Sequence, residues 1–437
     1  MSEIRSQRGD GSDSVPTVVV RTARWAALGS VVAAVATRYL LDSAVARGSS
    51  LAFFGDYALM MTLGLLLGSI APLGLPEVGN RYVADLIRAG EAQQVRWYLA
   101  LTSGLAVLLG LVLAGAVALL QPLIGLEAPG LGLSLALVVP SVGLLLARRG
   151  QALQLGGGNA VLFAPGLSTG LSVLLLIALL VSGVTVTLPW AGACVAVGNV
   201  LIAFGVCRPR IPGASSGRLG SLPSAVRGWI RSGLQAVSNA VASLVLTQGD
   251  IIVIGLLALD SSAGAYAAAS RLALVVTLAL GGLIPREAPI LGRLVAEGDP
   301  GGAWKQYRQA SMLSGAMGTA LCLGLWLLGE PILEAFVPGS GVAAGWLAVL
   351  AVGRLVSSFV GPGAELLIAF GQQRLAARCS WLGAVVAVAL MFALFPVWGP
   401  MGVAVGATLG MLVRSSGHFL AARHVTNREI QLVETER

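Results

Sequence analysis

The chain contains an internal repeat of about 209 residues, and this repeat lies within strongly apolar sequence. Three residues recur with the same internal spacing: Gly55, Tyr57 and Pro76 correspond to Gly264, Tyr266 and Pro285. Further along, Trp190 and Trp398 are each followed by Val-Ala-Val-Gly, at an offset of 208. Because homologous halves of a membrane protein commonly enclose a substrate path at their interface, the repeat predicts a transporter-like architecture.

The composition requires a membrane environment. Of the 437 residues, 56% are hydrophobic and 11% are charged, which is too apolar for a water-soluble chain of this length. Apolar runs long enough to cross a bilayer lie near 24–46, 57–76, 98–120, 129–147, 161–183, 187–206, 230–258, 263–284, 308–329, 341–364, 379–396 and 400–422. Since no ten-residue alternation suggests a barrel, we expect an all-α integral membrane protein. The prediction is about 12 transmembrane helices in two pseudo-symmetric six-helix bundles around a central cavity.

The segments between the spans predict the division of the chain. A stretch rich in Pro, Gly and Ser separates the sixth and seventh spans, where two duplicated units would be joined. We therefore expect an N-terminal tail at 1–23, a first bundle at 24–207, a linker at 208–229, a second bundle at 230–422 and a C-terminal tail at 423–437.

The positive charge has a one-sided distribution. Twenty-four of the 28 Lys and Arg fall in tails and loops on one side of the predicted membrane, and only Arg47 falls on the other. This asymmetry follows the positive-inside rule, so it predicts cytoplasmic termini in an inner (cytoplasmic) membrane. The net charge of +8 therefore reflects orientation, and we expect no nucleic-acid partner.

Two loops predict amphipathic helices at the membrane surface. Residues 78–88 and 290–297 each place apolar side chains on one helical face, and Gly90 and Gly298 follow as expected for helix C-caps. The pair Gly64 and Gly68, and the series Gly402, Gly406 and Gly410, have GxxxG spacing. We favour static packing within one half for these glycines over a sliding surface between the halves.

Charges within the spans carry the functional information. They are Arg38 and Asp42 in the first span, Asp250 in the seventh, Arg271 in the eighth, and Arg354 and Glu365 in the tenth. A lipid-facing Arg at a helix centre costs about 2.5–3.5 kcal/mol, so these groups are expected to face partners or water. The repeat register places Thr62 opposite Arg271, and Arg354 has no Arg counterpart. Such differences between the halves point to a specific substrate.

Structural interpretations remain open for each charge. Arg38 and Asp42 are four residues apart and can neutralise each other on one helix. Arg271 can pair with Asp250 across neighbouring spans. Arg354 either lines the cavity or snorkels to the surface, and Glu365 can be a solvated charge at a helix end.

We interpret the arginines together as a cationic cavity. Arg38, Arg271 and Arg354 are the candidate substrate-binding residues, because a guanidinium fork suits the oxygens of a diphosphate. Asp42, Asp250 and Glu365 are the candidates for ion coupling.

Signals for an enzyme are poor. His418 and His424, the only histidines, fall near the C-terminus, and no Gly-rich phosphate loop is present. Cys194, Cys207, Cys322 and Cys379 lack metal or redox spacing, so we interpret them as packing residues. We expect no catalytic residue, no metal site and no cofactor.

Dispersed residues along almost the whole chain resemble one transporter family. They are Gly55-Asp56-Tyr57, Leu73-Gly74-Leu75-Pro76, Arg81-Tyr82-Val83-Ala84, Gly90-Glu91, Asp250, Gly264-Ala265-Tyr266-Ala267-Ala268-Ala269, Pro285 and Gly371-Gln372-Gln373-Arg374. The pattern resembles the polysaccharide and O-antigen unit flippases of the multidrug/oligosaccharidyl-lipid/polysaccharide exporter superfamily. Twelve spans match this branch better than the flippases of peptidoglycan precursors, which usually add two more.

The resemblance implies a function. Such a protein moves an undecaprenyl-diphosphate-linked oligosaccharide between leaflets by alternating access, driven by an ion gradient (H⁺ or Na⁺) or the membrane potential. Arg38, with Asp42 beside it, stands where related flippases carry first-span charges. Membrane lipids, a glycan polymerase and glycosyltransferases are the implied partners. The alternatives are a drug/cation antiporter of the same superfamily, an integral-membrane glycan-processing enzyme and a non-transporting scaffold.

Overall fold

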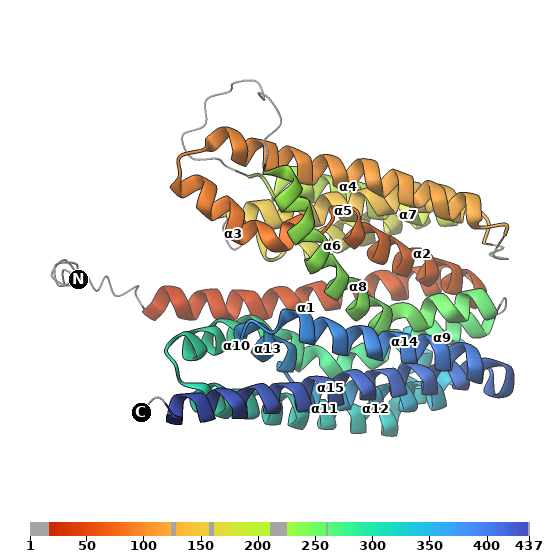
Figure 1. The fold of residues 1–437 in the computed structure, drawn as a ribbon. Helices are drawn as coiled ribbons and strands as arrows, with labels where there is room; N and C mark the ends of the chain where they lie inside the picture. The colour runs from red at the N-terminus through yellow and green to blue at the C-terminus, as the bar shows by residue number, and fades with distance from the viewer. Residues whose placement is uncertain (1–16, 124–127, 157–160, 210–224, 259–260, 436–437) are drawn as a thin grey trace.

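The computed structural model describes residues 17–123, 128–156, 161–209, 225–258 and 261–435, and all regular elements in these ranges are helices (Figure 1). Their bounds are α1 Thr17–Arg47, α2 Leu51–Ile70, α3 Leu75–Arg88, α4 Ala92–Leu120, α5 Leu131–Gln154, α6 Ala164–Val181, α7 Leu188–Gly205, α8 Val226–Leu257, α9 Ser261–Ala273, α10 Leu278–Ala296, α11 Pro300–Phe336, α12 Ala344–Val360, α13 Gly363–Ala369, α14 Gln373–Trp398 and α15 Pro400–Thr435.

The predicted class and helix number are confirmed. Within the described ranges, nine helical segments are long and apolar enough to cross a membrane. The remaining predicted spans correspond to α1, to α9 with α10, and to α15 (Figure 1). The helix α9 is separated from α10 by a 3₁₀ turn at Leu274–Thr277. The chain therefore has an all-α membrane fold with about twelve spans.

The helices form two halves with the first helix of each half at the junction. In the first half α4 packs on α5, and α7 packs on both α5 and α6. In the second half α11, α12, α14 and α15 pack against one another. Helix α1 packs along α6 and also touches α10 of the other half, while α8 crosses obliquely from α3 to α14 (Figure 1). Both crossings join the two halves.

The second predicted span is displaced in the sequence. Instead of covering 57–76, α2 begins after Ser50, whose hydroxyl accepts a hydrogen bond from the Phe53 amide at 3.2 Å. The helix ends at Ile70, because Leu73 (φ 51°) and Gly74 (φ 67°) adopt left-handed backbone conformations. Pro72 therefore lies in a break between two helices, and does not kink a continuous span.

Other boundaries also differ from the prediction. Arg148 and Arg149, which we expected in a loop, lie in the last two turns of α5. Residues 423–435, expected in a C-terminal tail, continue α15. Within the predicted linker, residues 210–224 lie outside the described residues, and α8 begins at Val226. The predicted boundaries followed the apolar part of each helix. Polar residues that continue a helix beyond its apolar part were therefore assigned to loops or tails.

The two segments that were predicted to form amphipathic helices are both helical. Residues 75–88 form the separate helix α3, whereas residues 290–296 are the last turns of α10, continuous with the part that precedes them. Both helices end in the same cap, with Gly90 at φ 72° and Gly298 at φ 74°. In each cap the next amide donates back five residues, from Glu91 to Leu86 and from Asp299 to Leu294. The predicted C-caps are confirmed.

The GxxxG glycines pack within their own halves. A Cβ on Gly64 would collide with Val138, and one on Gly68 would lie 2.7 Å from Val142, both on α5. A Cβ on Gly406 would lie 2.6 Å from the Met391 nitrogen on α14. These close approaches within each half support static packing over a sliding surface.

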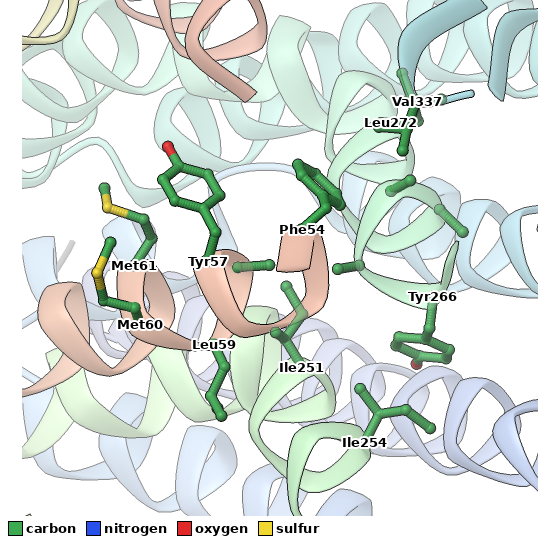
Figure 2. Close-up of a cluster of buried hydrophobic side chains, with 14 of the residues drawn as sticks. Phe54, Tyr57, Leu59, Met60, Met61, Ile251, Ile254, Tyr266, Leu272 and Val337 are labelled. Carbon is green, nitrogen blue, oxygen red and sulfur yellow. The ribbon is translucent and has the colours of Figure 1, made fainter. Parts of the chain in front are cut away.

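A different glycine pair joins the halves. A Cβ on Gly55 of α2 would lie 3.0 Å from the backbone nitrogen of Gly264 on α9. The surrounding core draws residues from both halves. Figure 2 shows Phe54 and Tyr57 of α2 near Ile251 of α8, with the rings of Tyr57 and Tyr266 pointing in opposite directions. The halves are therefore closely packed at the start of α2 and α9.

Candidate functional site

Asp42 pairs with two arginines, one from each half. Arg38, one helical turn earlier on α1, places Nε 3.2 Å from Oδ1 of Asp42. Arg271, on α9, places Nη1 3.6 Å from Oδ2 of the same carboxylate. Asp42 and Arg271 are 1% and 6% exposed, so this ion pair is buried where the halves meet. The carboxylate thus links the two bundles through charge.

Two tyrosines lie near this ion pair. The Tyr39 hydroxyl donates a hydrogen bond to the main-chain carbonyl oxygen of Arg271, which adds a second link between α1 and α9. Tyr57 on α2 is fully buried, and its hydroxyl has no hydrogen-bond partner. The Asp42 charge acts on both Tyr39 and Tyr57. The first half therefore contributes a carboxylate with nearby phenol groups.

Asp250 is held by hydrogen bonds from two hydroxyl groups. Its Oδ2 accepts a hydrogen bond from Ser270 Oγ at 2.7 Å and one from the Tyr266 hydroxyl at 3.3 Å. The pairing of Arg271 with Asp250, left open from the sequence, is wrong, because Arg271 bonds to Asp42 instead. Asp250 is 1% exposed, so it is a buried carboxylate held by hydroxyl groups.

Arg354 is buried and does not snorkel to the surface. It is 2% exposed on α12, and Nη2 donates a hydrogen bond to the Thr247 carbonyl oxygen of α8 at 2.6 Å. The opposite charge of Asp250 acts on Arg354. The charges of Arg271 and Arg354 both influence the Tyr39 hydroxyl, which bonds to the Arg271 main chain.

Several buried polar atoms of this group have no hydrogen-bond partner. The unpartnered donors are Nε and Nη2 of Arg271 and Nε of Arg354. Thr62 Oγ1, at the repeat position of Arg271, is also unpartnered. Buried guanidinium groups normally have their donors satisfied, so an anionic ligand would supply missing partners. The cluster is formally cationic, with Arg38, Arg271 and Arg354 against two aspartates.

Glu365 lies apart from this cluster. It lies on the short helix α13, which packs against α10, α11, α14 and α15. The charge that acts on Glu365 is that of Arg414 on α15. His418 is also on α15; it is buried, with its Nε2 3.1 Å from the Ala376 carbonyl oxygen. The six predicted site residues therefore divide into a group of five near the junction and Glu365 elsewhere.

The sequence contained one signal that the prediction missed. Asp42 lies 13 residues before Gly55 and Asp250 lies 14 residues before Gly264, so each half carries an acid at a similar, though not identical, distance before its Gly-x-Tyr motif. Each carboxylate lies near the tyrosine of the Gly-x-Tyr repeat, Tyr57 or Tyr266. Each half therefore contains a buried acid beside the tyrosine of its motif. Among the described residues, no group of three His, Cys, Asp or Glu side chains is placed to hold a metal ion.

No family model and no curated protein sequence matches this chain. Solved structures do match over nearly its whole length. An inward-facing multidrug resistance MATE family transporter of the MOP superfamily gives a TM-score of 0.73 at 15% identity, over 92% of this chain and 96% of that one. An outward-facing MATE family transporter gives 0.59 at 16% identity, over 94% and 96%. The lipid II flippase MurJ, in an inward closed conformation, gives 0.66 at 12% identity, over 96% and 91%. The chain is therefore similar in fold to MATE family transporters and to the flippase MurJ.

Proposed function

We propose that this protein is a flippase that moves a lipid-diphosphate-linked oligosaccharide across the cytoplasmic membrane by alternating access. The observation that carries the proposal is the sharing of Asp42 by Arg38 and Arg271, which come from opposite halves. Arg271 retains two unpartnered donor groups beside this ion pair, so an anion that reached the junction would find donors that the protein itself does not satisfy. A diphosphate has the charge and the oxygen spacing for such guanidinium groups.

The differences between the halves support an anionic cargo. A symmetric scaffold requires no arginine at position 271, since its repeat counterpart Thr62 is buried without one. The cost of burying Arg271 and Arg354 is therefore more consistent with substrate recognition than with maintenance of the fold. In this proposal the sugars follow the diphosphate, and the lipid tail stays in the bilayer.

Contacts at one end support an inward-facing state. Gly55 and Gly264 meet near the starts of α2 and α9, and Arg47 Nη2 donates to the Ala335 carbonyl oxygen at 3.0 Å. By the positive-inside orientation this end is external, so the halves are closed toward the outside. The TM-scores of 0.73 to an inward-facing and 0.59 to an outward-facing MATE transporter agree with this assignment. Rocking of the halves would then expose the arginines to the other side.

Asp42 and Asp250 are the proposed coupling residues, with H⁺ or Na⁺ as the coupling ion. Both are buried carboxylates near the junction, one in each half. Glu365 is a weaker candidate, because it lies on α13 away from the junction, where the nearby charge is that of Arg414. We also retain cytoplasmic termini, and a glycan polymerase and glycosyltransferases as partners, within this proposal.

The second candidate is a drug/cation antiporter. The similarity to MATE family multidrug transporters favours it. The charges oppose it, because three arginines surround two aspartates and an organic cation would meet a net positive cluster. The two functions therefore predict opposite charge selectivity.

Reconstituted liposomes distinguish the two functions. One assay follows a lipid diphosphate bearing a fluorescent oligosaccharide, with headgroups in the outer leaflet quenched by an impermeant reagent; a parallel assay follows uptake of a cationic dye. We expect diphosphate translocation and a loss of roughly tenfold or more in Arg38→Ala and Arg271→Ala. Arg271→Lys retains the charge but not the planar fork, and should be intermediate.

Arg88→Ala is the matched control, because Arg88 is an exposed arginine paired with Asp85 on α3. Full translocation by both Arg38→Ala and Arg271→Ala would contradict the cationic site. Dye uptake without diphosphate translocation would establish the antiporter instead. Gel filtration of each variant excludes misfolding as the cause of a loss.

A further inference from the structure

A second cluster of arginines lies at the opposite end of the first half from the α1–α2 turn. Arg148 and Arg149 lie near the end of α5, and Arg208 follows the end of α7, which packs on α5. Other arginines in surface segments have acidic partners: Arg88 pairs with Asp85, and Arg293 with Glu297. Within the described ranges, no carboxylate lies within ion-pair distance of these three arginines.

Phe204 organises this cluster. The guanidinium carbon of Arg148 lies 4.8 Å from the centre of the Phe204 ring, a cation–π arrangement. Arg208 Nε donates to the Phe204 carbonyl oxygen at 2.6 Å. The Nε atoms of Arg148 and Arg149 are both buried and have no hydrogen-bond partner. Phe204 thus positions the guanidinium groups of Arg148 and Arg208. The Nε donors of Arg148 and Arg149 lack a protein acceptor.

The outer surface beside the cluster is apolar. Phe204 is 47% exposed, and Val197, Val200 and Leu201 on the same helix are exposed as well. These four positions follow the i, i+3, i+4, i+7 pattern of one helical face. On a membrane-spanning helix, an exposed apolar face contacts acyl chains. The arginines therefore lie at one end of a strip that faces lipid.

The depth of the cluster matches a lipid headgroup. Arg148 follows Leu131, the first residue of α5, by 17 residues, which corresponds to roughly 25 Å along the helix axis. A hydrocarbon core of about 30 Å then places the guanidinium groups near the phosphates of the leaflet at that end. Since this end carries most of the basic residues of the chain, it is the cytoplasmic end in our orientation.

We propose that Arg148, Arg149 and Arg208 form a binding site for the phosphate of an anionic phospholipid in the cytoplasmic leaflet. The guanidinium groups bind the headgroup phosphate, and the α7 strip from Val197 to Phe204 contacts an acyl chain. Basic sites between membrane helices on this side are suited to anionic headgroups. The site is formed within the first half by α5 and α7, so it is separate from the proposed cargo path and independent of the proposed function. The lipid-facing strip favours a lipid over free phosphate.

Native mass spectrometry of the full-length protein, with phosphatidylglycerol or phosphatidylcholine added to the detergent, tests this site. We expect phosphatidylglycerol to be retained preferentially. Each arginine should contribute about fivefold in affinity, so the triple variant Arg148→Gln, Arg149→Gln, Arg208→Gln should lose on the order of a hundredfold. Phe204→Leu keeps all charges and an apolar surface but removes the ring, and should weaken binding severalfold.

The matched control removes the same charge from the same end: Arg88→Gln, Arg293→Gln, Arg423→Gln. These arginines are exposed, and the control should bind phosphatidylglycerol like the unmodified protein. Equal loss in both triple variants would overturn the site, because only net charge would then matter. A parallel arm with inorganic phosphate distinguishes the sources: displacement of phosphatidylglycerol by millimolar phosphate would overturn the assignment to a lipid. If the triple variant fails to fold, retention of lipid by Phe204→Leu at the original affinity would equally contradict the proposal.

Discussion

Gly55 and Gly264, which occupy equivalent positions in the two repeats, contact each other where α2 crosses α9. Equivalent residues of the repeat seen in the sequence thus meet at this crossing. Glycine is required because the two backbones approach within the radius of a side chain.

Substitution at this crossing should destabilise the closed arrangement. A Cβ on Gly264 would collide with the Leu51 carbonyl oxygen, a backbone atom that cannot rotate away. We expect Gly264→Ala to cost about 1–3 kcal/mol, as overpacking does. Gly55→Ala should cost less, because its Cβ would lie 3.0 Å from the Gly264 nitrogen. Thermal unfolding of the purified protein measures both effects.

Gly104→Ala is the control, because a Cβ on this α4 glycine would meet nothing within 4 Å. Alanine also favours a helix over glycine by roughly 0.5–1 kcal/mol, so this variant should be as stable as the unmodified protein or more stable. Equal losses in Gly104→Ala and Gly264→Ala would contradict the steric explanation.

The sequence was sufficient to predict the class and the approximate number of spans, since a long apolar run indicates a spanning helix even where its exact ends differ. The Schellman caps at Gly90 and Gly298 were also predicted, because a left-handed residue after a helix is a local property. The α2–α3 break was not, since an apolar run does not show where a helix changes direction. Arg148 and Arg149 were misplaced because polar residues at the end of a span resemble a loop.

The site was predicted by residue type more successfully than by pairing. Five of the six charges lie near the junction, but the partner of Arg271 is Asp42 and not Asp250. Sequence spacing specifies neighbours on one helix, such as Arg38 and Asp42, whereas pairing between helices depends on their tertiary arrangement. The presence of one acid shortly before each Gly-x-Tyr motif was visible in the sequence, but it was not recognised because the two spacings differ by one residue.

The ion pair between Asp42 and Arg271 predicts strong coupling between two substitutions. Asp42→Asn removes the carboxylate charge that Arg271 needs while buried, and should cost about 3 kcal/mol. The double variant Asp42→Asn, Arg271→Gln should cost less than the sum of the single losses, with a coupling energy on the order of 2 kcal/mol. Reversible unfolding in mixed micelles provides all four values of the cycle. Additive losses would indicate that the pair contributes nothing to stability.

The contact of Arg47 with α11 predicts an effect on the external closure. Arg47 Nη2 bonds to the Ala335 carbonyl oxygen, beside the buried Val337 at the end of α11. Arg47→Ala should loosen this end by about 0.5–1.5 kcal/mol, or roughly 2- to 10-fold in the open population.

The reporter is Val337→Cys in a background with the native cysteines replaced, reacted from outside with an impermeant thiol reagent. Faster labelling is expected in Arg47→Ala, whereas Arg88→Ala should label at the original rate; unchanged labelling in Arg47→Ala would exclude the contact as part of the closure.

Asp250 should respond differently from Asp42, although each is a buried acid beside the repeat tyrosine of its half. Its carboxylate accepts hydrogen bonds from Ser270 and Tyr266, and a neutral amide oxygen at position 250 can accept the same bonds. Asp250→Asn also removes the cost of burying a charge, while the Arg354 guanidinium keeps its bond to the Thr247 carbonyl oxygen. We therefore expect a stability change within about 1 kcal/mol, against about 3 kcal/mol for Asp42→Asn, in the same mixed-micelle unfolding assay. If Asp250 is a coupling residue, Asp250→Asn should remain folded and still lose the dependence of transport on an ion gradient. An equally large loss of stability in both variants would show that Asp250 has a structural ion-pair role, and that the difference in hydrogen-bonding partners has no energetic consequence.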